Sequence, residues 1–171
     1  TVKTILTEPN QLLRQISKTV KNVGKEEQQL MDDMLETMYA ANGIGLAAIQ
    51  IGVPKRIIVM DLSKDEKKKE PRYFVNPIIK NKDILKSTYE EGCLSVPNQF
   101  AEIDRPKNCD IEYLDYYGEK KVLKAEGLLA TCIQHEMDHL EGILFIDYLS
   151  KLKKSMIIKK LSKIKSTRIV V

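Results

Sequence analysis

Residues 127–142 read GLLATCIQHEMDHLEG, and this stretch predicts the element around which the fold is built. We expect a helix over Gly127–Leu140, with Gly142 just beyond its end. The apolar residues that surround its polar positions indicate a buried helix rather than an exposed one. The chain has two histidines, His135 and His139, and both lie in this segment. Residues at i and i+4 share one helix face, so both imidazoles can reach a single metal ion.

Glu136 stands directly after the first histidine and completes an HExxH pattern. In such sites the glutamate stays off the metal and handles the proton of a bound water molecule. The alternative is a surface helix with two solvated histidines, which the apolar surroundings disfavour.

A catalytic metal site needs a third protein ligand and an open position for water. The only carboxylates after His139 are Glu141 and Asp147, both very close to it, so a downstream ligand is poorly supported. Cys132 lies on the histidine face but about 10 Å along the axis from His139, too far to share its ion. We expect Cys132 to line the core or a pocket. Cys93, in EEGCLSVP, is the better candidate for a strand that presents a thiolate.

Length and composition predict a single domain over residues 1–171. The chain is 43% hydrophobic and 30% charged, which argues against disorder. Three cysteines without a secretion signal argue against a disulfide framework. No apolar run approaches the roughly 20 residues that span a bilayer. The net charge of +4 is mild, and we expect neither a membrane nor a DNA partner.

The remaining pattern predicts an α+β fold with mostly antiparallel sheet. Strands precede helices in blocks rather than alternating with them. Helices are expected near Asn10–Ser17, over Lys25–Ala41 and over Ser150–Lys165, where the last is amphipathic. Strands are expected at Arg56–Leu62, Arg72–Val75, Ile78–Lys80, Ser87–Glu91, Cys109–Tyr117 and Lys120–Lys124.

Three blocks resemble the motifs of one family, in the family's order. GIGLAAIQ (43–50), EGCLS (91–95) and QHEMDH (134–139) are similar to the motifs of peptide deformylases, and the likeness covers most of the chain. It implies that Cys93, His135 and His139 bind the metal and that Glu136 is the general acid/base. It also implies that the side chain of Gln50 and the backbone N–H of Leu94 assist the oxyanion. Gly45 would lie against the substrate backbone.

The resemblance also implies a fold and a reaction. Antiparallel sheet would wrap around the HExxH helix, with a C-terminal helix after it. The enzyme would remove the formyl group from N-terminal formylmethionine of new polypeptides and release formate, through attack by metal-bound hydroxide. One divalent ion is implied, Fe²⁺ in the cell, with Zn²⁺, Ni²⁺ or Co²⁺ able to replace it. The expected location is the bacterial cytoplasm rather than an organelle.

An apolar pocket for the methionine side chain is implied as well. Leu128, Thr131 and Cys132 should line it, with contributions from Ile44 and Tyr89. One departure concerns Phe100, where many bacterial relatives carry Arg. Arg105 either compensates for that loss or is a surface residue.

The C-terminal segment from Lys151 to Arg168 carries eight basic residues and no acidic ones. Leu149, Leu152, Ile157, Leu161 and Ile164 form an approximate helical stripe. One interpretation is an amphipathic helix that docks by this stripe and leaves a solvated basic face. The other is contact with ribosomal RNA near the peptide exit, as the resemblance implies.

The sequence disfavours three other functions. An HExxH endopeptidase is disfavoured because the downstream ligand is missing. A structural metal or RNA-binding module is disfavoured because structural zinc sites usually have four protein ligands. Nucleotide binding at the GxG of residues 43–45 is disfavoured because a third glycine is missing and a helix, not a strand, precedes it.

Overall fold

The computed structural model describes residues 1–65 and 67–170, with side chains described up to Leu161. The fold is α+β, as predicted, with antiparallel sheets and three α-helices in these residues. The helices are α1 (Lys25–Ala40), α2 (Gly127–Leu140) and α3 (Lys151–Val170), with short 3-10 helices η1 (Gln11–Arg14), η2 (Ala48–Ile51) and η3 (Phe145–Tyr148). The strands are β1 (Gly45–Ala47), β2 (Ile57–Met60), β3 (Arg72–Lys82), β4 (Lys86–Cys93), β5 (Val96–Pro106), β6 (Asn108–Leu114) and β7 (Lys120–Glu126).

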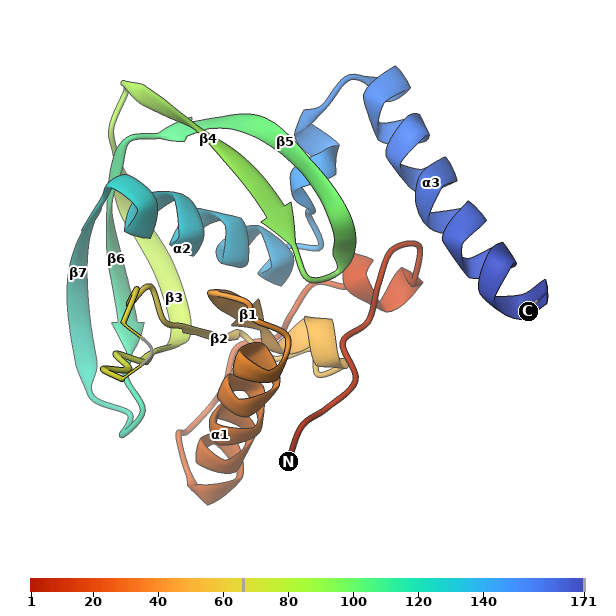
Figure 1. Ribbon diagram of the computed structural model, residues 1–171. Coiled ribbons are helices and arrows are strands. Elements are labelled where there is room, and N and C mark those ends of the chain that lie inside the picture. The colour runs from red at the N-terminus through yellow and green to blue at the C-terminus, as the bar shows by residue number, and fades with distance from the viewer. Residues whose placement is uncertain (66, 171) are drawn as a thin grey trace.

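Two antiparallel sheets enclose α2. The larger has the strand order β1-β2-β3-β6-β7, and the smaller is the β4–β5 hairpin. Figure 1 shows the hairpin passing over α2 on the side opposite the larger sheet. Helix α2 contacts strands of both sheets. The helix with both histidines is therefore held from two sides.

Strand β2 shows why the larger sheet lies between two helices. All four of its residues are buried, and alternate side chains point to opposite faces. Ile58 and Met60 pack in the core beneath α2, whereas Ile57 and Val59 pack against α1. Helix α1 meets them with Met31, Met34 and Met38, which recur at helical spacing.

Several predicted boundaries were wrong. The β5 strand was not predicted, and β3 is a single strand with register shifts where two short strands were expected. The helix expected near Asn10–Ser17 is the single 3-10 turn η1. In β5 the side chains mostly alternate between half-buried and exposed, and Pro97 and several charged residues interrupt the apolar pattern.

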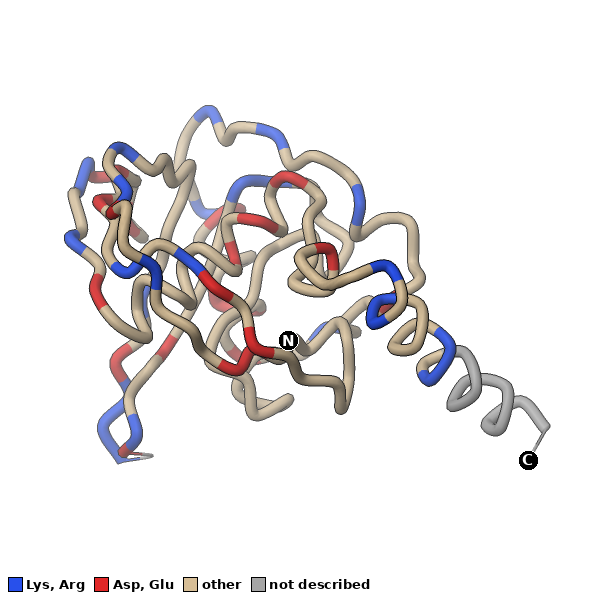
Figure 2. Tube along the Cα trace, turned by 90° about the horizontal axis from the view of Figure 1, so that it is seen from above, with Lys and Arg blue, Asp and Glu red and all other residues tan. Residues whose placement is uncertain are grey.

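Helix α3 extends away from the body of the molecule (Figure 1) and carries lysines along its described part (Figure 2). Ile157 and Leu161 pack into a core cluster with β5 and η3. Leu152 is 71% exposed, so its predicted place in the docking stripe is wrong. Ile164 and the last basic residues lie outside the described side chains. No helix in the described part of the chain is long and apolar enough to cross a membrane.

Candidate active site

Cys93, His135 and His139 come together although they are far apart in the sequence. One potential ligand atom from each lies within 4.8 Å of the others. The Cys93 Sγ is 3.3 Å from His139 Nε2. Ligand atoms around one tetrahedral zinc-sized ion are about 3.4–3.7 Å apart, so this thiolate and imidazole set fits a divalent ion. Cys132 is outside the group, as the helical spacing predicted.

The end of β4 places Cys93 against α2. The β4–β5 register shifts between Gly92 and Cys93, so that Gly92 pairs with Phe100 but Cys93 pairs with Val96. Such a bulge re-aims the side chain that follows it. Asn98 lies in β5 between these two pairs and has φ of 60°, a left-handed conformation that asparagine tolerates. The local backbone thus directs the Cys93 thiol toward the histidines.

A buried chain of charged groups holds His135. Its Nδ1 is 2.9 Å from the Glu91 carboxylate. Arg105 donates two hydrogen bonds to Glu91, at 2.7 and 2.9 Å, and a third to Asp138 at 2.8 Å. A carboxylate partner on one ring nitrogen fixes the other toward a metal. The Nε2 of His135 is therefore aimed at the cluster.

One of the two predicted roles for Arg105 was wrong. It is 4% exposed, so it is not a surface residue. Three of its five N–H donors bond to Glu91 and Asp138, and its compensation for the arginine of relatives stays a prediction. Sequence reasoning also missed Glu91. The available signal was strand alternation, because Glu91 stands two residues before Cys93 and shares its face.

The ionisation of these groups follows from their burial and partners. Burial opposes charge on Glu91, but His135 and Arg105 outweigh it and lower the pKa of the carboxyl. Burial also opposes charge on His135, yet Cys93 and Glu91 raise its pKa. The pKa of His139 is held well below its ordinary value by burial and by the nearby His135. An ion would take neutral imidazole, so its binding would release the proton of His135.

Glu136 lies beside both imidazoles. Its Oε1 is 3.8 Å from His135 Nε2 and 3.7 Å from His139 Nε2. The side chain is 3% exposed, and burial raises the pKa of its carboxyl to about 7. A carboxyl with a pKa near neutral can both accept and return a proton. Gly45 lies directly against it, because a Cβ there would be 2.6 Å from Glu136 Oε2.

Gln50 connects η2 to the cysteine-bearing segment. Its side-chain oxygen accepts a hydrogen bond from the Ala47 N–H at 2.9 Å. Its amide nitrogen is 3.0 Å from Ser95 Oγ and 3.6 Å from Cys93 Sγ. The amide therefore faces the cluster, and its part in oxyanion stabilisation stays a prediction, as does that of the Leu94 N–H.

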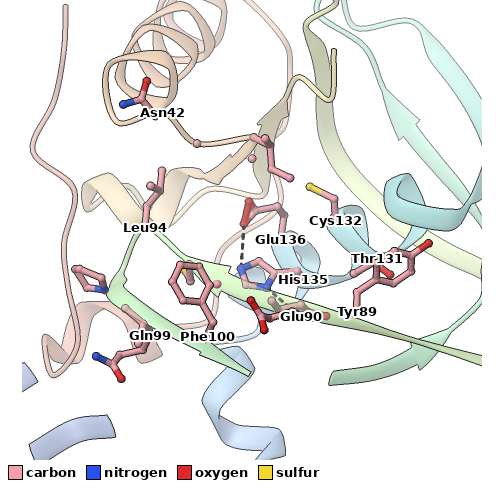
Figure 3. Close-up of a pocket in the computed structure, with 18 of the residues that line it drawn as sticks. Asn42, Tyr89, Glu90, Leu94, Gln99, Phe100, Thr131, Cys132, His135 and Glu136 are labelled. Carbon is pink, nitrogen blue, oxygen red and sulfur yellow. Dashed lines mark hydrogen bonds and ion pairs between the residues drawn. The ribbon is translucent and has the colours of Figure 1, made fainter. Parts of the chain in front are cut away.

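A cavity of about 450 Å³ opens beside the cluster. Such a volume is typical of a ligand pocket. All five residues predicted for a methionine pocket line it, namely Ile44, Tyr89, Leu128, Thr131 and Cys132. Gln50, Leu94, Gly45 and two of the cluster residues line it as well. Figure 3 shows Cys132 and Thr131 from α2 and Tyr89 from β4 around this space. Their role in binding stays a prediction.

The cavity runs along the free edge of β4. Five consecutive residues of this strand, 89–93, line it, although alternate side chains point to opposite faces. Within the described part of the chain β4 pairs only with β5, so its other edge faces the cavity. An extended peptide can add to such an edge through main-chain hydrogen bonds.

Comparison with known proteins gives one family. The sequence profile of the polypeptide deformylase family matches residues 2–155. A peptide deformylase of Pelagibacter ubique is 81% identical over 170 residues, covering 99% of each chain. One from Maricaulis maris is 53% identical over 167 residues, covering 98% of this chain and 96% of the relative. The crystal structure of peptide deformylase from Ehrlichia chaffeensis has a TM-score of 0.94 at 42% identity, covering 99% of each chain.

Proposed function

Since this chain belongs to the polypeptide deformylase family, whose members are hydrolases, we propose that it removes the formyl group from the N-terminal formylmethionine of new polypeptides. The observation that carries the proposal is the group of Cys93, His135 and His139 beside a buried Glu136, at one cavity. Nascent chains arise where ribosomes translate, so we infer a bacterial cytoplasmic location.

The three-residue cluster would hold one divalent ion and leave a position open. Bound there, the ion would act as a Lewis acid and lower the pKa of water toward about 7. Thiolate and imidazole donors suit Fe²⁺ and Zn²⁺ better than Mg²⁺ or Ca²⁺. We infer Fe²⁺ in the cell, with Zn²⁺, Ni²⁺ or Co²⁺ able to occupy the site in purified protein.

The protein's own residues then handle the protons and the charge. Glu136 takes a proton from the attacking water and delivers it to the leaving amine, as the C–N bond breaks and formate departs. The Gln50 amide and the Leu94 N–H donate to the oxygen that becomes negative; one such donor contributes about 3–4 kcal/mol. Glu91 keeps His135 oriented during this cycle. The methionine side chain enters the part of the cavity between Tyr89 and Cys132.

The test is hydrolysis of formyl-Met-Ala-Ser by anaerobically purified protein. Replacing Glu136→Gln removes the proton acceptor with little change in shape, and we expect a loss of about 10²–10⁴-fold with the metal content unchanged. Glu112→Gln, at an exposed position of β6, is the matched control and should keep full activity. No formate from metal-loaded, folded wild type would refute the proposal. Cleavage of internal bonds in a blocked peptide would favour an endopeptidase instead.

We also propose that α3 contacts ribosomal RNA. Lys151, Lys153, Lys159 and Lys160 are exposed on it, whereas Lys154 pairs with Asp147 at 2.7 Å. Such contacts would weaken steeply with added salt. Changing the four exposed lysines to glutamine keeps Ile157 and Leu161 in their core cluster. Ribosome cosedimentation that is unchanged by this variant, or unchanged by salt, would contradict the proposal.

A further inference from the structure

One face of the β4–β5 hairpin, called the outward face below, carries an exposed aromatic ring beside carboxylates next to the cavity. Glu90 and Gly92 share this face of β4, because alternate residues of a strand point the same way. Gly92 pairs with Phe100 and Glu90 pairs with Glu102, so one aromatic ring and two carboxylates lie together. Phe100 is 64% exposed, a large apolar area to leave in water.

Phe100 is held in place against Gly92. A Cβ on that glycine would be 2.6 Å from two carbon atoms of the ring, so the ring covers the glycine backbone. Phe100, Glu90 and Gly92 all line the cavity. Figure 3 shows the ring on the same cavity as His135 and Glu136. No Lys or Arg lines this cavity among the residues that the structure describes.

The strand geometry relates this face to one position of a bound peptide. Tyr89, Glu91 and Cys93 share the inward face, where the methionine pocket and the cluster lie. In a peptide extended along β4, the side chain after methionine points the opposite way. It therefore reaches the outward face, next to Phe100 and Glu90.

We propose that Phe100 and Glu90 set a preference at the second residue of the substrate. This inference rests on the proposed deformylase activity. The ring offers apolar contact to aliphatic side chains and to the methylene stem of a lysine. The two glutamates repel a carboxylate and attract an ammonium group. Substrates with Leu or Lys after formylmethionine are processed faster than those with Glu.

The experiment compares kcat/KM for formyl-Met-Leu-Ala, formyl-Met-Lys-Ala and formyl-Met-Glu-Ala, all amidated so that only the second side chain changes the charge. The metal-loaded wild type should process the Leu and Lys peptides at least about threefold faster than the Glu peptide, the size of an exposed charge interaction. Added salt should reduce the Lys-to-Glu ratio.

Variants separate the two residues. Glu90→Gln should lower the Lys-to-Glu ratio, and Phe100→Arg should bring it to one or below. Val122→Arg adds the same charge on exposed β7, away from the cavity, and should leave the ratio unchanged. Equal kcat/KM for the three peptides, or a ratio that Phe100→Arg does not move, would overturn this inference while leaving the deformylase proposal intact. No hydrolysis of any peptide would instead sink the proposed function itself.

Discussion

Replacing Arg105→Ala should cost far more stability than an ordinary surface change. The side chains of Arg105 and Glu91 are each 5% exposed, and two hydrogen bonds join them. Removing one partner of a buried ion pair leaves the other charge uncompensated, which costs about 3–5 kcal/mol. Arg56 offers the matched control, because its partner Glu141 is 51% exposed. Arg56→Ala should cost about 0–1 kcal/mol.

The assay is urea unfolding of the chelator-treated protein, so that metal binding does not add to the measured stability. A second variant tests the cause. Arg105→Met combined with Glu91→Gln removes both charges of the pair, so the double variant should be more stable than Arg105→Ala. If Arg105→Ala and Arg56→Ala lower the free energy of unfolding by the same amount, Arg105 and Glu91 do not behave as a buried ion pair and the reasoning fails.

Three further predictions concern the site and its surroundings. Gly45→Ala places a methyl group 2.6 Å from the Glu136 carboxylate, so formate release should fall at least tenfold while circular dichroism stays unchanged; full activity would contradict the contact. Burial opposes charge on Asp147, but hydrogen bonds from Lys154 and Arg14 lower the pKa of its carboxyl. Its contribution to stability is therefore complete at neutral pH and is lost progressively as the pH falls from about 4 through that lowered pKa. The difference in melting temperature between wild type and Asp147→Asn should therefore shrink as the pH falls below about 4, and a difference that stays constant over that range would argue against the linkage. Burial raises the pKa of the Cys109 and Cys132 thiols, so both should react slowly with a labelling reagent. A bound ion should protect Cys93, and removal of the ion should expose one newly reactive thiol per chain. No change in labelling on metal removal would exclude Cys93 as a ligand.

The sequence predicted what depends on local spacing. The i, i+4 histidines and the glycine beyond them were enough to place α2 over Gly127–Leu140, and the structure has the same bounds. Strand β2 was also predictable, because all its side chains are apolar. The rise per residue of a helix was enough to exclude Cys132 as a metal ligand, and in the structure Cys132 is not part of the cluster.

Other features depend on contacts that no local pattern contains. β5 is a half-exposed strand whose partner is set by a hairpin register with a shift near Cys93. That register decides that Arg105 lies on the same face as Glu91, so a buried pair could not be told from a surface arginine in the sequence alone. Leu152 looked like part of an apolar stripe, but it stands five residues before Ile157, about 140° around the helix, and its side chain stays in solvent while Ile157 and Leu161 are buried.

The most direct test of the central claim is a metal titration of activity. Protein stripped with a chelator under anaerobic conditions should release no formate from formyl-Met-Ala-Ser. Adding Fe²⁺ should restore activity in proportion to the amount added, and the rise should stop sharply at one equivalent per chain. The His139→Ala variant should show no recovery. Full activity in the stripped protein, or recovery by the His139→Ala variant, would contradict a metal centre built from Cys93, His135 and His139.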